Sequence, residues 1–154
     1  MSNAVAAIVV ARCCQIDWPV IAQALCAFPG VKRRFDVLGC YTMTSSQTGI
    51  RVIDDYGHHP REVMATLATI RNVWPERRVV LAFQPHRFSR TQALFEDFTH
   101  VLSEVDVLLL LAVYPAGEEP ITGADGRALC RSIRQRGHVD PIFVEDENEL
   151  AKAL

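Results

Sequence analysis

The sequence predicts an α/β fold with a Rossmann-like, open and mostly parallel sheet, helices on both faces, and a short helical segment in front. Strand-like and helix-like stretches alternate from residue 50 onward, a rhythm typical of parallel sheets covered by helices. The run VDVLLLLAV at 105–113 is apolar throughout, as expected of a central strand that is buried on both sides.

Local signals set the order of the elements. Two helices are expected at 3–14 and 17–27, the second with Asp17 as its N-cap and Pro19 in its first turn. Two strands between Asp36 and Asp54 are joined by the polar turn TSSQTG. The pattern then predicts a helix at 60–73, a strand at 78–83, a helix from near Ser89 that includes Leu102, the strand at 105–113, a helix at 126–136, a strand at 141–145 and a helix from 147.

Composition and charge exclude several classes of protein. The chain has 154 residues, 49% of them apolar, which suffices for one full core. A net charge of −2 argues against a general nucleic-acid binder. Five cysteines without CxxC spacing argue against a disulfide framework or a zinc site and favour the reducing cytosol. The apolar run AVAAIVVA is too short to span a membrane, and no basic segment typical of a signal peptide precedes it.

Chemically active side chains gather where the predicted strands end. The three stretches are DDYGHH at 54–59, QPHRFSR at 84–90 and YPAGEE at 114–119. In open α/β sheets, ligands bind at the carboxyl ends of the strands. The sequence therefore predicts a polar cleft at that edge of the sheet.

Arg87 and Arg90 lie three residues apart around the start of a predicted helix. At that spacing their guanidinium groups could converge on one carboxylate or phosphate, with help from the helix N-terminus. The alternative is that both are surface arginines that pair with Glu96 or Asp97.

The stretch at 54–59 has several possible uses. His58 and His59 are adjacent and point in different directions, so we expect one to cap or pack and the other to meet a polar ligand. Asp54 and Asp55 could cap the following helix, hold a ribose hydroxyl or assist magnesium. Gly57 allows a sharp turn or a close approach to a ligand.

Other polar residues leave alternatives open. The basic run Lys32, Arg33 and Arg34 is either a solvated face or a phosphate contact at a domain boundary. Asn3 can be a simple helix cap. The sequence contains no GxxxxGK[ST] phosphate loop, so the chain alone is not an ATPase of that class.

The motifs NAVAAI, FPGVKRRF, DDYGHHP and FQPHRFSRT occur in the order and at about the spacing found in the Mur ligases, and the chain resembles that family over nearly its whole length. DDYGHHP together with QPHRFSRT most resembles the branch that joins L-alanine to UDP-N-acetylmuramate in peptidoglycan synthesis. The alternatives are the branch that recycles murein tripeptide and a non-catalytic module that binds a nucleotide or an amino acid. The resemblance implies that residues 1–30 are the last helices of a central ATPase domain. Residues 31–154 would be a C-terminal Rossmann-like, amino-acid-binding domain that ends early.

The resemblance also implies roles for single residues. Arg87 and Arg90 would hold the carboxylate of alanine, and Tyr56 and His58 would line the amino-acid pocket and orient the amine. His86 would support them. No residue is assigned as catalytic or as a metal ligand.

For the nucleotide, the resemblance implies that Asp55 contacts the ATP ribose, Arg34 the phosphates and Asn3 the adenine. The reaction would be a cytoplasmic, ATP- and Mg²⁺-dependent amide formation, with the phosphate loop, the magnesium ligands and the UDP-sugar site in other domains of the same enzyme. Its expected partners are UDP-N-acetylmuramate, L-alanine, ATP and those domains, with neither nucleic acid nor membrane. The fragment alone is expected to be inactive.

Overall fold

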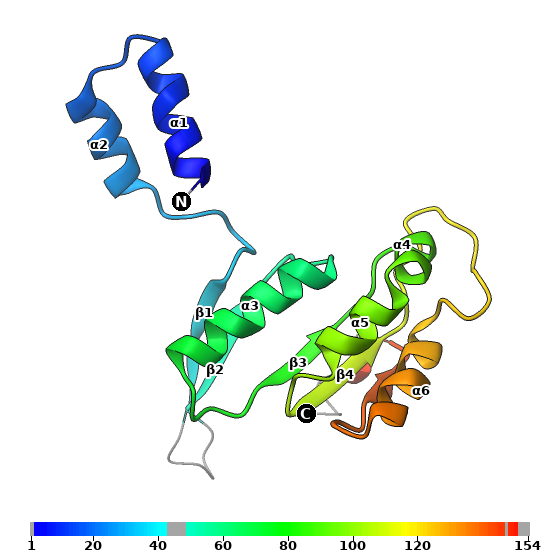
Figure 1. The fold of residues 1–154 in the computed structure, drawn as a ribbon. Helices are drawn as coiled ribbons and strands as arrows, with labels where there is room; N and C mark the ends of the chain where they lie inside the picture. Colours follow the sequence, from blue (N-terminus) through cyan, green and yellow to red (C-terminus); the bar gives the residue numbers. More distant parts are fainter. Residues whose placement is uncertain (1, 43–48, 147, 151–154) are drawn as a thin grey trace. The chain divides into compact units, whose positions relative to one another are not determined.

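The structure, a computed structural model, describes residues 2–42, 49–146 and 148–150. The chain divides into two compact units, residues 1–54 and residues 55–154 (Figure 1). The domain boundary predicted at residue 30 lies inside the first of these units.

The first unit contains a helix pair and a strand pair. Helices α1 (Ser2–Cys13) and α2 (Trp18–Ala27) lie close to their predicted bounds. Proline occupies the first turn of α2, as predicted, but the Asp17 side chain makes no capping hydrogen bond. Strands β1 (Asp36–Tyr41) and β2 (Ile50–Asp54) pair antiparallel as a separate two-stranded sheet. The predicted turn between them lies mostly outside the described residues.

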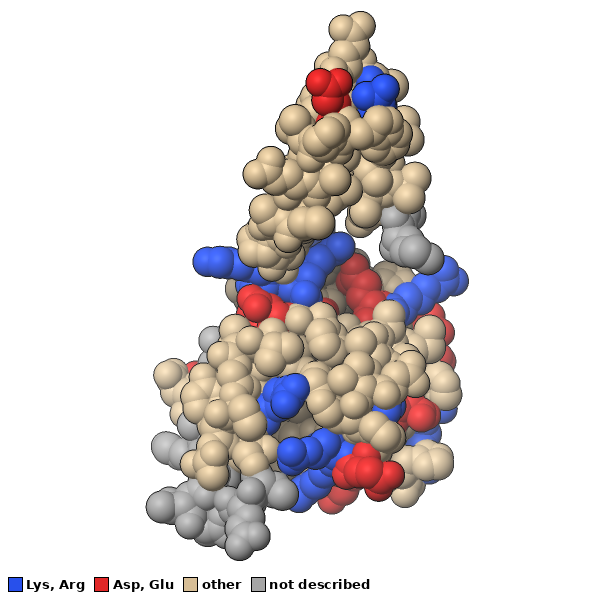
Figure 2. Space-filling model, turned by 90° about the vertical axis from the view of Figure 1, so that its left-hand side faces the viewer, with Lys and Arg blue, Asp and Glu red and all other residues tan. Residues whose placement is uncertain are grey.

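The helix pair presents a largely apolar surface. Among the described residues of 2–28, Arg12 and Asp17 are the charged ones, and Figure 2 shows correspondingly little charge on this part of the chain. Val5, Trp18 and Phe28 are each more than half exposed. Large apolar side chains that are exposed in such numbers on one helix pair are typical of a surface that packs against another protein part.

The second unit is built on a three-stranded parallel sheet in the order β3-β4-β5. Strand β4 (Val107–Leu111) lies between β3 (Val80–Phe83) and β5 (Ile142–Val144). The apolar run at 105–113 thus supplies the central strand, as predicted. The helices of this unit are α3 (Pro60–Val73), α4 (Phe88–Ala93), α5 (Phe95–Leu102) and α6 (Gly126–Arg136), and residues 148–150 are also helical.

The core lies on both sides of β4. On one face, Leu108 and Leu110 pack into the cluster formed with α3, α5 and α6. On the other face, Leu109 and Leu111 pack with β5 and with Leu150. Residues 108–110 are fully buried, and burial of each such side chain contributes roughly 1.5–3 kcal/mol. The mixed α/β fold with a parallel sheet flanked by helices is therefore confirmed.

One predicted helix is two. The apolar pattern from Ser89 to Leu102 suggested a continuous helix, but α4 ends and α5 begins at Leu94, whose backbone angles (φ −118°, ψ 25°) are not helical. No glycine or proline marks this break in the sequence. Strands β3 and β4 are also shorter at their ends than predicted.

Among the described residues, no helix is long and apolar enough to cross a membrane.

Candidate functional site

The ends of β3 and β4 are joined beyond the sheet itself. His86 and Tyr114 form an isolated parallel bridge. The Tyr114 backbone N–H donates to the carbonyl of Pro85, and the Arg87 N–H donates to the carbonyl of Tyr114, each at 2.8 Å. These bonds fix the two strand-end stretches side by side, as the sequence predicted.

A row of rings crosses this edge of the second unit. The His86 ring stacks on Tyr114 with 5.3 Å between centroids. His58 lies 6.2 Å from His86, and Tyr56 meets His58 edge-on at 5.3 Å. The stretch at 54–59 and the stretch at 84–90 therefore meet, as predicted. Tyr114, the fourth member of the row, comes from the third predicted strand-end stretch, YPAGEE.

Arg90 is held by His86. Its guanidinium lies 3.4 Å from His86 Nδ1 and 3.3 Å from the His86 carbonyl oxygen. Since arginine only donates, Nδ1 must be the unprotonated nitrogen of that ring when this bond forms. Burial, followed by the positive charges of Arg90 and Arg87, lowers the pKa of His86. The neutral imidazole is therefore the form that this environment favours.

Arg87 has a strained backbone. Its φ is +73°, in the left-handed region that L residues seldom adopt. Its carbonyl accepts from the backbone N–H and the hydroxyl of Thr91, which is fully buried. Such strain costs about 1–3 kcal/mol and is commonly found at functional sites, where the surroundings enforce it.

The sequence did not identify two residues of this site, Ser89 and Glu118. The Ser89 N–H and hydroxyl donate to the two oxygens of Glu118 at 2.9 and 2.7 Å. Arg87 NH1 approaches the same carboxylate at 3.9 Å. A side chain from the next loop thus takes the Ser89 N–H at the helix start, and the help of this helix start in binding a ligand anion stays a prediction. The only signal in the sequence was that YPAGEE follows a strand.

The alternative pairing of the two arginines with Glu96 or Asp97 does not occur among the contacts found in the described residues. Glu96 instead accepts from Arg136 at 3.3 Å. Arg87 and Arg90 both point to partners within the cluster at the strand ends.

The adjacent residues His58 and His59, just before α3, make different contacts. His59 is the N-cap of α3: its Nδ1 accepts from the Arg61 N–H, and Glu62 completes a capping box. His58 Nδ1 donates to the Tyr56 carbonyl at 3.1 Å. The expectation that one histidine caps the helix is confirmed, and the contact of His58 with a polar ligand stays a prediction. The capping role considered for the two aspartates is wrong, because His59 takes it.

Asp54 and Asp55 make other contacts. Asp54 pairs with Arg33 at 3.3 Å within the first unit. Asp55 Oδ1 accepts from the Gly57 N–H at 2.7 Å. A Cβ added to Gly57 would lie 2.7 Å from that same oxygen, so a side chain at this position would displace the Asp55 carboxylate from its bond.

The remaining predicted nucleotide contacts belong to the first unit. Asn3 lies on α1 and Arg34 lies in the turn before β1, and both are exposed. Their assignment to adenine and phosphate stays a prediction, as does that of Asp55 to the ribose.

No group of three or more His, Cys, Asp or Glu side chains in the described part of the chain is arranged to hold a metal ion. The described residues therefore offer no ligand set for Mg²⁺.

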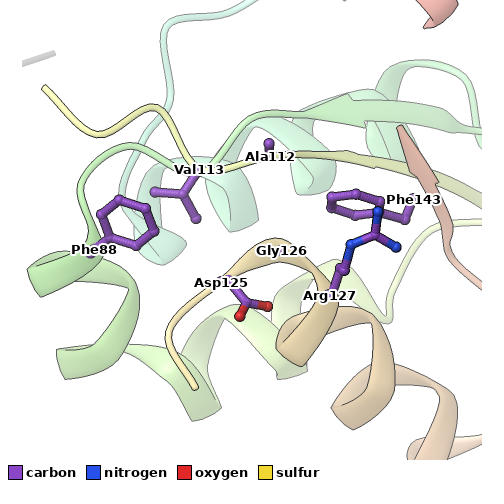
Figure 3. A pocket seen from close by; sticks show the side chains of 7 residues that line it. All are labelled: Phe88, Ala112, Val113, Asp125, Gly126, Arg127 and Phe143. Carbon is purple, nitrogen blue, oxygen red and sulfur yellow. The ribbon is translucent and has the colours of Figure 1, made fainter. Parts of the chain in front are cut away.

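A pocket of about 250 Å³ lies beyond the carboxyl end of β4 (Figure 3). Phe88 and Val113 line one side, and Arg127 and Phe143 line the other, with Asp125 and Gly126 from the start of α6. None of the predicted site residues lines it. It is therefore distinct from the cluster at the strand ends, although Phe88 directly follows Arg87.

This chain is similar to one known protein family and to parts of solved structures of larger proteins. The family described as "Mur ligase, glutamate ligase domain" matches residues 33–154. The UDP-N-acetylmuramate-alanine ligase MurC from Thermotoga maritima is similar in structure with a TM-score of 0.70 and 30% identity, over 99% of this chain and 30% of that chain. A murein peptide ligase from Psychrobacter arcticus 273-4 matches with a TM-score of 0.55 and 20% identity, over 86% of this chain and 26% of that chain. This second likeness shows the fold alone. The chain thus spans less than a third of the length of either protein.

Proposed function

Because the chain belongs to the Mur ligase family, we propose that it is the C-terminal part of an ATP-dependent ligase that joins L-alanine to UDP-N-acetylmuramate in the cytoplasm. The observation that carries this proposal is the cluster at the ends of β3 and β4. It combines two arginines with a row of rings in one small region. A pair of guanidinium groups suits the carboxylate of an incoming amino acid.

The hydrogen bonds within this cluster support a separate proposed role for each of its residues. Arg87 and Arg90 bind the carboxylate of alanine. Neutral His86 accepts from Arg90 and so fixes the direction of that guanidinium. These contacts would hold the amino acid by the end that does not react, which leaves its amine to be positioned from the other side of the cluster.

His58 lies suitably for the amine. Its Nδ1–H is engaged by the Tyr56 carbonyl, so in the neutral ring the lone pair lies on Nε2. That nitrogen can accept a hydrogen bond from an N–H of the alanine amine. This bond would orient the lone pair of the amine toward the acyl group. Tyr56 lies edge-on to this ring and is proposed to contact the same amino acid.

ATP supplies the phosphoryl group that activates the muramate carboxylate as an acyl phosphate, which the amine then attacks with loss of phosphate. The nucleotide contacts proposed for this chain are Asp55 with the ribose, Arg34 with the phosphates and Asn3 with the adenine. The phosphate loop, the Mg²⁺ ligands and the UDP-sugar site are proposed to lie in the other domains of the enzyme.

Residues 1–30 are proposed to be the last helices of the central ATPase domain. The support for this is the apolar surface of α1 and α2, which includes Val5, Trp18 and Phe28. A helix pair of this kind gains stability when a larger core covers it.

The test is phosphate release by the full-length protein that contains this chain, with ATP, Mg²⁺ and UDP-N-acetylmuramate. L-alanine and murein tripeptide are added in separate runs. Release that depends on alanine is the expected result. Release with tripeptide alone would transfer the assignment to the recycling branch. Release with neither would favour a non-catalytic binding module.

A further inference from the structure

Glu118 lies on the loop after β4, and its carboxylate is bound to the start of α4. It accepts two hydrogen bonds from Ser89, at 2.9 Å from the backbone N–H and 2.7 Å from the hydroxyl. These bonds lower the pKa of Glu118, the backbone bond most of all, so the side chain is ionised at neutral pH. The two strand-end loops are thus joined by a charged side chain as well as by their backbones.

A tight turn directs Glu118 toward α4. Its N–H donates to the Pro115 carbonyl at 3.0 Å, and both central residues of the turn have positive φ, +51° at Ala116 and +84° at Gly117. Such a turn is natural for glycine and unfavourable for alanine. The loop keeps this conformation in spite of the strain at Ala116, which indicates that contacts beyond the turn stabilise it.

The carboxylate also faces Arg87, the residue with a strained backbone that is proposed to bind the amino acid. Its NH1 nitrogen lies 3.9 Å from Glu118 Oε1. This separation is an ion-pair contact, too long for a hydrogen bond. It favours the guanidinium direction that faces Glu118 and leaves the N–H donors of the planar fork for a second anion. A long side chain held in this way loses less conformational freedom when it binds a ligand.

We propose that Glu118 is a positioning residue for amino-acid binding: through Ser89 and Arg87 it holds the Arg87 guanidinium where the carboxylate of the substrate arrives. The proposal rests on the proposed function of the cluster. The opposite role, in which the Glu118 carboxylate competes with the substrate for Arg87, predicts tighter substrate binding when the charge of Glu118 is removed.

The test compares Glu118→Gln, Glu118→Asp and Glu119→Gln in the full-length protein, by phosphate release with ATP, Mg²⁺, UDP-N-acetylmuramate and varied L-alanine. Glu119→Gln removes the same charge from the neighbouring exposed residue. Loss of a charged partner should raise the KM for alanine about tenfold in Glu118→Gln. Glu118→Asp should recover part of this loss, and Glu119→Gln should match wild type. The KM for ATP should stay unchanged in all three, which also shows that the variants are folded.

A second comparison isolates the route through Arg87. In an Arg87→Ala background, Glu118→Gln should raise the KM for alanine far less than it does in wild type, because the group that it positions is gone. An unchanged or lowered KM for alanine in Glu118→Gln, or an equal rise for alanine and ATP, would overturn the inference while the alanine-dependent activity of wild type stands. Wild type without alanine-dependent release would instead overturn the proposed function, and this inference with it.

Discussion

The close contact between α6 and β4 leaves no room for a side chain at Gly126. A Cβ at this position would lie 2.7 Å from the Leu111 carbonyl oxygen and 2.9 Å from a ring carbon of Phe143. The oxygen belongs to the backbone of β4 and cannot rotate away, so Gly126→Ala must push the helix from the sheet. Overpacking of this kind costs about 1–3 kcal/mol. Gly126 is the first residue of α6, so alanine recovers only part of the about 1 kcal/mol that its propensity gives in a helix interior. The expected net loss is therefore roughly 1–2 kcal/mol.

Equilibrium urea unfolding, followed by far-ultraviolet circular dichroism, measures this loss. Gly137→Ala serves as the control at the other end of α6, where an added Cβ meets no atom within 4 Å and the φ of +75° alone causes strain. Phe143→Leu should restore part of the stability of Gly126→Ala and none of that of Gly137→Ala. A Gly126→Ala variant as stable as wild type would refute the close packing of α6 on β4.

Two other predictions concern titration and reactivity. The fold lowers the pKa of His86 from 6.5, so the unfolded chain binds the proton more readily than the folded chain. The contribution of His86 to the free energy of unfolding therefore decreases as the pH falls below about 6.5. The charged or titratable groups near His86 are Arg90, Arg87, His58 and Glu118. NMR titration of the His86 ring in the folded protein should give a pKa below 6.5, and a pKa above 6.5 would contradict the described burial. Cys130 is buried with a raised pKa, while the other cysteines, at 13, 14, 26 and 40, are exposed. A thiol reagent should therefore modify those four in the native chain and Cys130 only after unfolding. Rapid modification of Cys130 in the native chain would contradict the packing of α6.

The elements with strong local signals were predicted closely. Helices α3 and α6 have the predicted bounds, because each begins at a marked start, Pro60 or Gly126 after Asp125, and carries a clear apolar face. The Asp125 side chain caps α6 by accepting from the Ala128 N–H at 2.6 Å. The break at Leu94 had no such mark, since packing of α5 against α3 and α6, rather than local propensity, sets the direction of that helix.

The sequence predicted most residues of the site, but it did not predict the contacts that these residues make with one another. Sequence order placed Tyr56, His58 and His86 at strand ends, and the fold brings their rings together. Glu118 was not recognised, because its role depends on a turn with positive φ at Ala116, which no composition signal predicts. Contacts between loops that are distant in sequence follow from the tertiary fold.

The most direct test of the account is the effect of Arg87→Ala on the two substrates of the full-length protein. Loss of a charged hydrogen bond to a carboxylate should raise the KM for L-alanine about 10- to 100-fold and leave the KM for ATP unchanged. Arg131→Ala, which removes an exposed arginine of α6 outside the cluster, should alter neither value. Equal losses for alanine and ATP in Arg87→Ala would contradict the assignment of this cluster to the carboxylate of the amino acid.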